Sequence, residues 1–296
     1  MNILGSYMNG NFRTIILNDG TKIRETEEDN FVPMFAENID VKICNKCSAG
    51  CKFCHEGSTP DGKLGDIMNE KFIETLHPYQ EIAIGGGNIL EHPDLVPFLY
   101  KLKERKVIAN ATVNQIHFEQ NQEIIKELTS KKLIYGLGVS LVNPTHRFIE
   151  TIKNYPNAVI HVINGVVREN QLRVLENHEL KLLILGYKHL RRGNEYFVDK
   201  QKEIEINQSF LYEYLPEMVA KFKVVSFDNL AVEQLNCRRM MSQEEWDEFY
   251  MGDDSEFTYY IDMVERKFAK SSTAPMNERY ELLDSVDEMF ERIKKK

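Results

Sequence analysis

Short apolar runs rich in β-branched residues alternate with amphipathic helical patterns along most of this 296-residue chain. In the helical patterns, apolar residues recur every three or four positions and therefore share one face of a helix. The alternation predicts βα units around a parallel sheet, an α/β fold that curves into a barrel or partial barrel. The expected strands lie at residues 41–44, 82–84, 107–112, 135–140, 159–163, 182–186 and 224–227.

Different patterns flank this core. Residues 1–37 contain two β-branched runs on either side of Asn18-Asp19-Gly20, which predicts a β-hairpin cap. We place the core at residues 38–230 and a C-terminal extension that packs on it at residues 231–296. The extension is expected to hold a second hairpin, over residues 257–270, and a final helix that begins at about Asn277. The apolar face of that helix would consist of Leu282, Leu283, Val286, Met289, Phe290 and Ile293.

Four of the five cysteines lie within eleven residues, at positions 44, 47, 51 and 54. Disulfides between such near neighbours would close small, strained rings. The N-terminus lacks the basic flank and apolar core of a secretory signal, and the longest apolar runs are far shorter than the roughly 20 residues of a membrane span. We therefore expect a cytoplasmic protein whose thiolates bind a metal.

Zinc is the main competitor for these thiolates. Structural zinc sites usually join two Cys-x-x-Cys knuckles from separate turns. Here only three residues separate Cys47 from Cys51, which leaves little chain to fold one knuckle over the other. The spacing also departs from the ferredoxin order, in which two short gaps precede the longer one. A non-catalytic zinc or iron-sulfur protein that uses all four clustered cysteines, Cys44 included, stays open as an alternative.

Without Cys44, the pattern Cys47-x3-Cys51-x2-Cys54, with Phe53 before its last cysteine, resembles the cluster loop of the radical S-adenosylmethionine (radical SAM) superfamily. The resemblance implies that the three cysteines hold one [4Fe-4S] cluster whose fourth iron is open to S-adenosyl-L-methionine (SAM). It implies reductive cleavage of SAM to a 5′-deoxyadenosyl radical, which abstracts a hydrogen from a small-molecule or peptide substrate. A flavodoxin- or ferredoxin-type reductant is the implied partner. The implied fold is a partial (β/α)6 barrel over residues 41–229.

A run of glycines, Gly85-Gly86-Gly87-Asn88, follows the second expected strand. Glycines at a strand end allow backbone angles and a close ligand approach that a β-carbon would block. In the resembled family this place holds a Gly-Gly-Glu motif that meets the amino group of SAM. Asn88 departs from the motif, because its amide accepts a hydrogen bond from an ammonium group without the strength of a carboxylate. The resemblance nevertheless assigns these four residues to SAM.

Small polar residues end the later strands. Ligands of such folds bind at the carboxyl ends of the strands, and the resemblance assigns polar residues there to the ribose and carboxylate of SAM. Turns also need small polar residues, so a purely structural role is an open alternative for each. Residues 161–166 are expected to pack on the adenine. The candidates for polar contacts are Thr112, Asn114, Ser140 and Asn164.

The sixth strand is followed by Tyr187, His189, Arg191 and Arg192, which are candidates for the substrate side of the site. An exposed basic loop is an equal alternative for the two arginines. Cys237 is the fifth cysteine, so the thiolates suffice for one four-iron cluster and not for two. Some epimerases of the resembled superfamily use a thiol as hydrogen donor, which makes Cys237 a candidate for that role. The alternative is a small buried hydrophobe.

The net charge is −9, from 37 basic and 46 acidic residues. An acidic chain without a long basic stripe disfavours extended binding to a nucleic-acid backbone. A small metabolite or a peptide is therefore the expected substrate. A SAM-dependent enzyme without radical chemistry, such as a methyltransferase, is a further alternative, but nothing here resembles its glycine-rich loop at the first strand.

Overall fold

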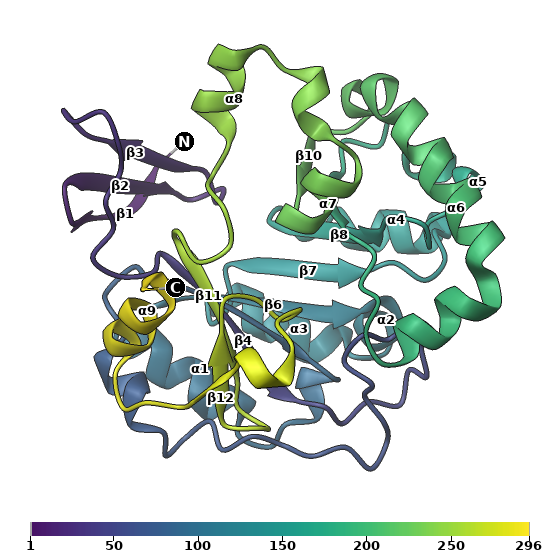
Figure 1. Ribbon diagram of the computed structural model, residues 1–296. Helices are drawn as coiled ribbons and strands as arrows, with labels where there is room; N and C mark the ends of the chain where they lie inside the picture. Colours follow the sequence, from purple (N-terminus) through teal and green to yellow (C-terminus); the bar gives the residue numbers. More distant parts are fainter. Residues whose placement is uncertain (1, 296) are drawn as a thin grey trace.

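A ten-stranded sheet forms the centre of the computed structural model, which describes residues 2–295 (Figure 1). Strands β4 to β10 run parallel, and their order in the sheet follows the sequence. Each overlaps one expected strand, so the predicted parallel α/β architecture is confirmed. The strands are β4 (Asn38–Cys44), β5 (Glu81–Gly86), β6 (Ile108–Asn114), β7 (Gly136–Ser140), β8 (Ala158–Ile163), β9 (Lys181–Leu185) and β10 (Val224–Phe227).

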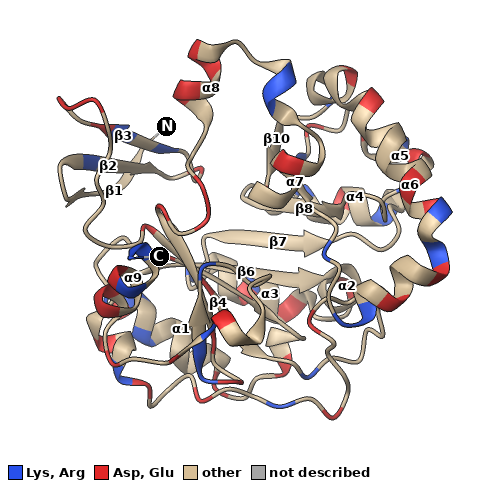
Figure 2. Cartoon of the chain, viewed as in Figure 1, with Lys and Arg blue, Asp and Glu red and all other residues tan. Residues whose placement is uncertain are grey.

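Helices connect these strands and bury apolar faces against the sheet. In α1, for example, the apolar stripe Leu95, Phe98, Leu99 and Leu102 is buried. Figure 2 shows that the central strands β7 and β8 lack charged residues, whereas residues of both signs lie along α6. The helices are α1 (Leu95–Glu104), α2 (Gln115–Gln120), α3 (Gln122–Ser130), α4 (His146–Ile152), α5 (Glu169–Leu175), α6 (Arg192–Met218), α7 (Asn229–Gln234), α8 (Gln243–Phe249) and α9 (Val286–Lys294). Within residues 2–295, no helix combines the length and the apolar character needed to cross a bilayer.

The N-terminal segment forms a separate antiparallel sheet of β1 (Ile3–Asn9), β2 (Phe12–Leu17) and β3 (Lys22–Glu25). The predicted hairpin is confirmed as the β2–β3 pair. Strand β1 was not predicted, and it pairs with β2 along its whole length. In Figure 1 this sheet lies beside the C-terminal segment, and Phe12 meets Phe257 edge-on at a ring separation of 6.1 Å.

Glu37 fastens the N-terminal sheet to the core. Its carboxylate is almost fully buried and accepts hydrogen bonds from Thr14 Oγ1 at 2.9 Å and Arg24 Nη2 at 2.8 Å. Lys22 Nζ lies 3.3 Å away. Burial alone would raise the pKa of Glu37, but these three partners outweigh it and hold the pKa below its usual value.

We expect Glu37→Gln to lower the free energy of unfolding by about 1.5–3 kcal/mol near pH 7, because hydrogen bonds to a buried charge are lost. A depressed native pKa stabilises the fold above the unfolded-state value of about 4.3, and this contribution disappears as pH falls through the native pKa. The difference between wild type and variant should therefore shrink below about pH 4. Urea unfolding near pH 7 and near pH 3 measures it. An unchanged difference at the lower pH would contradict this role of the charge.

The C-terminal extension joins the central sheet. Strand β11 (Thr258–Asp262) pairs in parallel with β4, and β12 (Lys267–Ala269) pairs antiparallel with β11, which confirms the second predicted hairpin. The predicted start of the final helix at Asn277 is wrong. Strand β13 (Tyr280–Glu281) pairs with β12 there, and α9 begins only after Ser285, whose hydroxyl accepts from the Glu288 amide. Leu282 and Leu283 therefore pack on the core from outside the helix. The domain boundaries after residues 37 and 230 stay predictions.

Candidate active site

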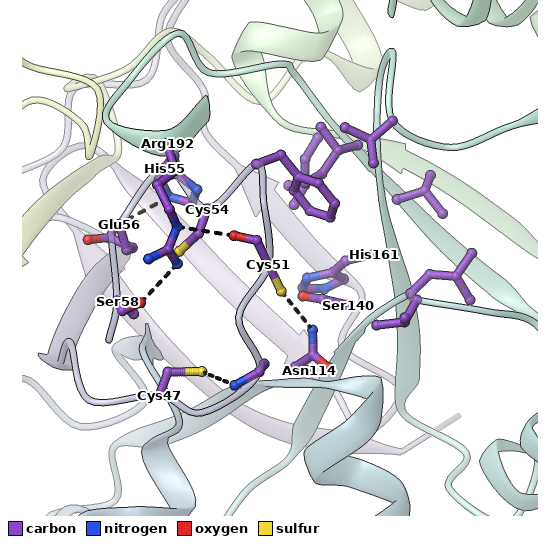
Figure 3. Close-up of a pocket in the computed structure, with 18 of the residues that line it drawn as sticks. Cys47, Cys51, Cys54, His55, Glu56, Ser58, Asn114, Ser140, His161 and Arg192 are labelled. Atoms are coloured by element: carbon purple, nitrogen blue, oxygen red, sulfur yellow. Dashed lines mark hydrogen bonds and ion pairs between the residues drawn. The ribbon is translucent and has the colours of Figure 1, made fainter. Parts of the chain in front are cut away.

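A cavity of about 360 Å³ opens at the carboxyl ends of the parallel strands (Figure 3). The cysteine loop and the start of α6, which contact each other, form one wall, and the ends of β5 to β9 form the floor. Most of the predicted site residues meet here although they are far apart in sequence. Those that line the cavity are Cys47, Cys51, Phe53, Cys54, Gly86, Gly87, Thr112, Asn114, Ser140 and Arg192, together with residues 161–163 and 166.

The four clustered cysteines separate into one buried and three cavity-facing residues. Cys44 ends β4, is fully buried, and does not line the cavity; burial raises the pKa of its thiol to about 11. Cys47, Cys51 and Cys54 are half-buried and face the cavity. Backbone hydrogen bonds from Cys47 N to Thr59 O and from Cys54 N to Cys51 O shape the loop between them.

Two of the three cavity-facing cysteines, Cys47 and Cys51, have N–H donors close to their sulfur atoms. The Ala49 amide donates to Cys47 Sγ at 3.5 Å, and Asn114 Nδ2 donates to Cys51 Sγ at 3.6 Å. Burial raises the pKa of both thiols, so these donors are needed to stabilise their thiolate forms. Within residues 2–295, no three side chains of His, Cys, Asp or Glu converge closely enough to bind a single metal ion. A four-iron cluster does not require such convergence, because each thiolate binds a different iron.

Two consecutive arginines at the start of α6 hold the cysteine loop. Arg192 Nε donates to Cys51 O at 3.2 Å and its Nη2 donates to Ser58 O at 2.8 Å (Figure 3). Arg191 Nη1 donates to Glu56 O at 2.8 Å. The sequence suggested a substrate-side role or an exposed basic loop for this pair. Arg192 lines the cavity and Arg191 is exposed, and both arginines also donate to backbone carbonyls of the cysteine loop or of the residues that follow it.

A buried ion network binds the same loop to the sheet and to the C-terminal extension. Lys42 of β4 is 2% exposed, and its Nζ lies 2.9 Å from Glu56 Oε2 and 3.2 Å from Asp262 Oδ2. Burial disfavours the charged form of Glu56, but His55 and Lys42 outweigh burial and hold its pKa well below the usual range. Because Lys42 precedes the cysteine loop and Glu56 follows it, this ion pair joins the two ends of the loop.

The glycine run brings β5 against the cysteine loop. Gly86 has φ +114, a backbone conformation that favours glycine. Gly87 donates its amide to Cys44 O at 2.8 Å, and a β-carbon on Gly87 would lie only 2.2 Å from Lys46 O. A β-carbon on Gly85 would meet nothing within 4 Å. Close backbone approach is thus required at Gly86 and Gly87 but not at Gly85, which does not line the cavity.

We expect Gly87→Ala to lower the free energy of unfolding by about 1–3 kcal/mol, because a backbone carbonyl cannot move aside as a flexible side chain can. Gly85→Ala is the matched control and should stay close to wild type. Urea unfolding measures both variants, and iron uptake shows whether the cysteine loop has shifted. Equal stability of the two variants would contradict the close-approach explanation.

Besides Gly85, the predicted residues Asn88, Asn164 and Tyr187 lie outside the cavity lining. The Asn88 side chain is 4% exposed; it accepts from Leu90 N at 3.3 Å and donates to Glu91 Oε1 at 2.9 Å. Asn164 is 1% exposed, and its Nδ2 donates to Gln234 Oε1 at 3.1 Å. Tyr187 is buried as well, with its hydroxyl donating to the Gly193 carbonyl. Their hydrogen bonds give Asn88 and Tyr187 structural partners, whereas Asn164 Oδ1 is buried without one.

Two further candidates also lie away from the cavity lining. Cys237 is 3% exposed and starts a short 3₁₀ turn (Cys237–Met240) after α7. Burial raises the pKa of its thiol to about 11, which fits the buried-hydrophobe alternative rather than a hydrogen donor in the cavity. His189 contacts the rings of Tyr187 and Phe197.

Two histidines close to the site were not singled out individually from the sequence. His117 of α2 is 3% exposed, and its Nε2 lies 3.5 Å from Cys47 Sγ. His161 of β8 lies across Gly138, where a β-carbon would come 2.3 Å from its ring. Burial lowers the pKa of His161 to about 4, so the imidazole is neutral near pH 7.

Comparison with known proteins adds evidence on the fold. No family model and no curated protein sequence matches this chain significantly. Structures of Streptococcus suis SuiB do match: one bound to S-adenosylmethionine with a TM-score of 0.54 and 12% identity, and one bound to the precursor peptide SuiA with a TM-score of 0.51 and 11% identity. The chain shares the fold of SuiB.

The match with SuiB covers 81% of this chain and 60–61% of the SuiB chain. Because identity is so low, the likeness shows the fold and leaves the activity to be proposed. One of these SuiB structures holds S-adenosylmethionine, so the resemblance that the cysteine spacing indicated is confirmed at the level of the fold.

Proposed function

We propose that this protein is a radical SAM enzyme in which Cys47, Cys51 and Cys54 hold one [4Fe-4S] cluster. One observation carries the proposal: of the four clustered cysteines, these three face a cavity at the carboxyl ends of the parallel strands. The same fold in SuiB has been captured with bound S-adenosylmethionine, which supports SAM as the ligand of this cavity. The sheet, with strands in sequence order and helices between them, is compatible with a partial (β/α)6 barrel.

Residues of this chain would shape the SAM site in three ways. Gly86 and Gly87 line the cavity at the end of β5, and their close approach to Cys44 O and Lys46 O places this strand end beside the cysteine loop. Thr112 and Ser140 offer hydroxyls from neighbouring strands for the ribose and carboxylate. Phe53 lies beside Tyr196 of α6 at a ring separation of 5.9 Å, and together they limit the access of water. The bound cluster and SAM supply the radical that abstracts hydrogen from a substrate carbon.

A peptide is the substrate class that the comparison supports best, because SuiB has been captured with the precursor peptide SuiA. The cavity lining continues past the cysteines to Val166, Val167 and Arg168, which offer apolar and cationic surface on the substrate side. A flavodoxin- or ferredoxin-type reductant in the cytoplasm completes the proposal.

The test is SAM cleavage without any substrate. The protein is purified anaerobically, reconstituted with iron and sulfide, and incubated with dithionite and SAM. We expect 5′-deoxyadenosine and methionine in amounts that depend on the cluster. About one zinc per chain, with neither iron uptake nor cleavage, would favour the four-cysteine zinc protein instead.

A further inference from the structure

The end of β6 and the start of α2 bring two N–H donors to the thiols of Cys47 and Cys51. Asn114, the last residue of β6, directs Nδ2 at Cys51 Sγ over 3.6 Å. His117, one helical turn further on, places Nε2 3.5 Å from Cys47 Sγ. The two donors therefore reach two different cysteines of the proposed cluster from one short segment.

Hydrogen bonds within the turn fix the orientation of both donors. Asn114 Oδ1 accepts from the Ile116 amide at 2.9 Å as the cap of α2, so only the NH₂ side of the amide can face Cys51. Gln115 Nε2 donates to Asn143 O at 2.7 Å and fastens the start of α2 to the segment after β7. His117 is 3% exposed, which leaves its ring little room to rotate.

The direction of these hydrogen bonds follows from the chemistry of a metal-bound thiolate. Such a sulfur has no proton to give, so across either distance the nitrogen must donate. Imidazole has at least one N–H in either protonation state, and a thiolate acceptor 3.5 Å from Nε2 draws that proton to Nε2. Hydrogen bonds to cluster sulfurs withdraw electron density and stabilise the reduced, more negative state.

We infer that Asn114 and His117 are outer donors to the cluster thiolates of Cys51 and Cys47 and raise the reduction potential of the cluster. The inference rests on the function proposed above. It gives Asn114 a role other than the SAM contact expected from the sequence, and it assigns a role to His117, which that expectation left without one. Both are positioning residues, because they act through the cysteines.

The experiment is a redox titration of the reconstituted protein without SAM, followed by EPR. We expect His117→Phe, which keeps a ring but has no donor, to reduce the ratio of reduced to oxidised cluster about tenfold at a fixed potential, a shift of about 59 mV for one electron. His117→Gln retains an N–H and should recover part of the shift. Asn114→Ser, which keeps a helix cap but has a shorter side chain, should shift the midpoint in the same direction.

The outcomes separate this inference from the proposed function. If wild-type protein forms no [4Fe-4S] cluster, the proposed function itself fails. If the cluster forms and His117→Phe titrates like wild type, the donor role is overturned. If His117→Phe takes up no iron, the midpoint potential of Asn114→Ser becomes the test. A midpoint equal to that of wild type in Asn114→Ser would overturn the inference.

Discussion

Cys51→Ala is expected to take up no stable [4Fe-4S] cluster and to produce 5′-deoxyadenosine only at the level of a blank without protein. Cys47→Ala and Cys54→Ala should behave in the same way. The physical reason is the ligand count: a cluster that keeps one iron open for SAM has three protein thiolates and no spare ligand. Iron and sulfide content and the yield of 5′-deoxyadenosine measure the effect.

Cys44→Ala and Cys237→Ala are the matched controls. Both thiols are buried and neither lines the cavity, so both variants should retain iron, sulfide and SAM cleavage. Their loss of a buried sulfur costs some stability, which urea unfolding reports separately. If Cys44→Ala lost its metal as completely as Cys51→Ala, all four cysteines would be ligands and the three-cysteine assignment would be wrong.

Asp262→Ala is expected to cause the largest loss of stability outside the cysteine loop, about 3–5 kcal/mol, because it removes the carboxylate paired with Arg279 and leaves buried Lys42 with Glu56 alone. The Asp262 side chain is fully buried, and its Oδ2 lies 3.2 Å from Lys42 Nζ and 3.4 Å from Arg279 Nη1. Its Oδ1 also accepts from the amides of Val264 and Glu265 at 3.1 Å each. Urea unfolding measures the loss.

Asp284→Ala is the control for that prediction. Asp284 pairs with Lys71 at 2.8 Å on the surface, with side chains 72% and 76% exposed, and such pairs contribute about 0–1 kcal/mol. A similar loss in both variants would contradict the claim that burial gives the Asp262 network its weight. Because Lys42 also pairs with Glu56, Asp262→Ala should in addition weaken iron retention by the cysteine loop.

The parts of the site that the sequence predicted are those with a local signature. Cys47, Cys51 and Cys54, the proposed cluster ligands, lie within eight residues, so their spacing alone describes one loop. Thr112 and Ser140 are also brought to the cavity, because the carboxyl ends of parallel strands share one edge of the sheet. The cysteine loop and the strand-end positions of Thr112 and Ser140 could be predicted because each depends only on the order of residues along a short segment.

Contacts between distant segments had no such signature. His117 is 70 positions from Cys47, and Arg192 is 141 positions from Cys51. Either residue could have been an ordinary surface or core side chain. The predicted start of the final helix was wrong for a related reason. The apolar spacing around Leu282 continues a helical stripe, but the pairing of Glu281 with β12 keeps the chain extended there. Tertiary pairing overrode the local pattern there.

We propose that SAM binds at an open iron of a cluster held by Cys47, Cys51 and Cys54. The EPR spectrum of the reduced, anaerobically reconstituted protein, recorded with and without SAM, tests this directly. We expect a reduced [4Fe-4S] signal whose shape and g values change when SAM is added. A cluster signal indifferent to SAM, or a protein that retains zinc and forms no cluster, would contradict it.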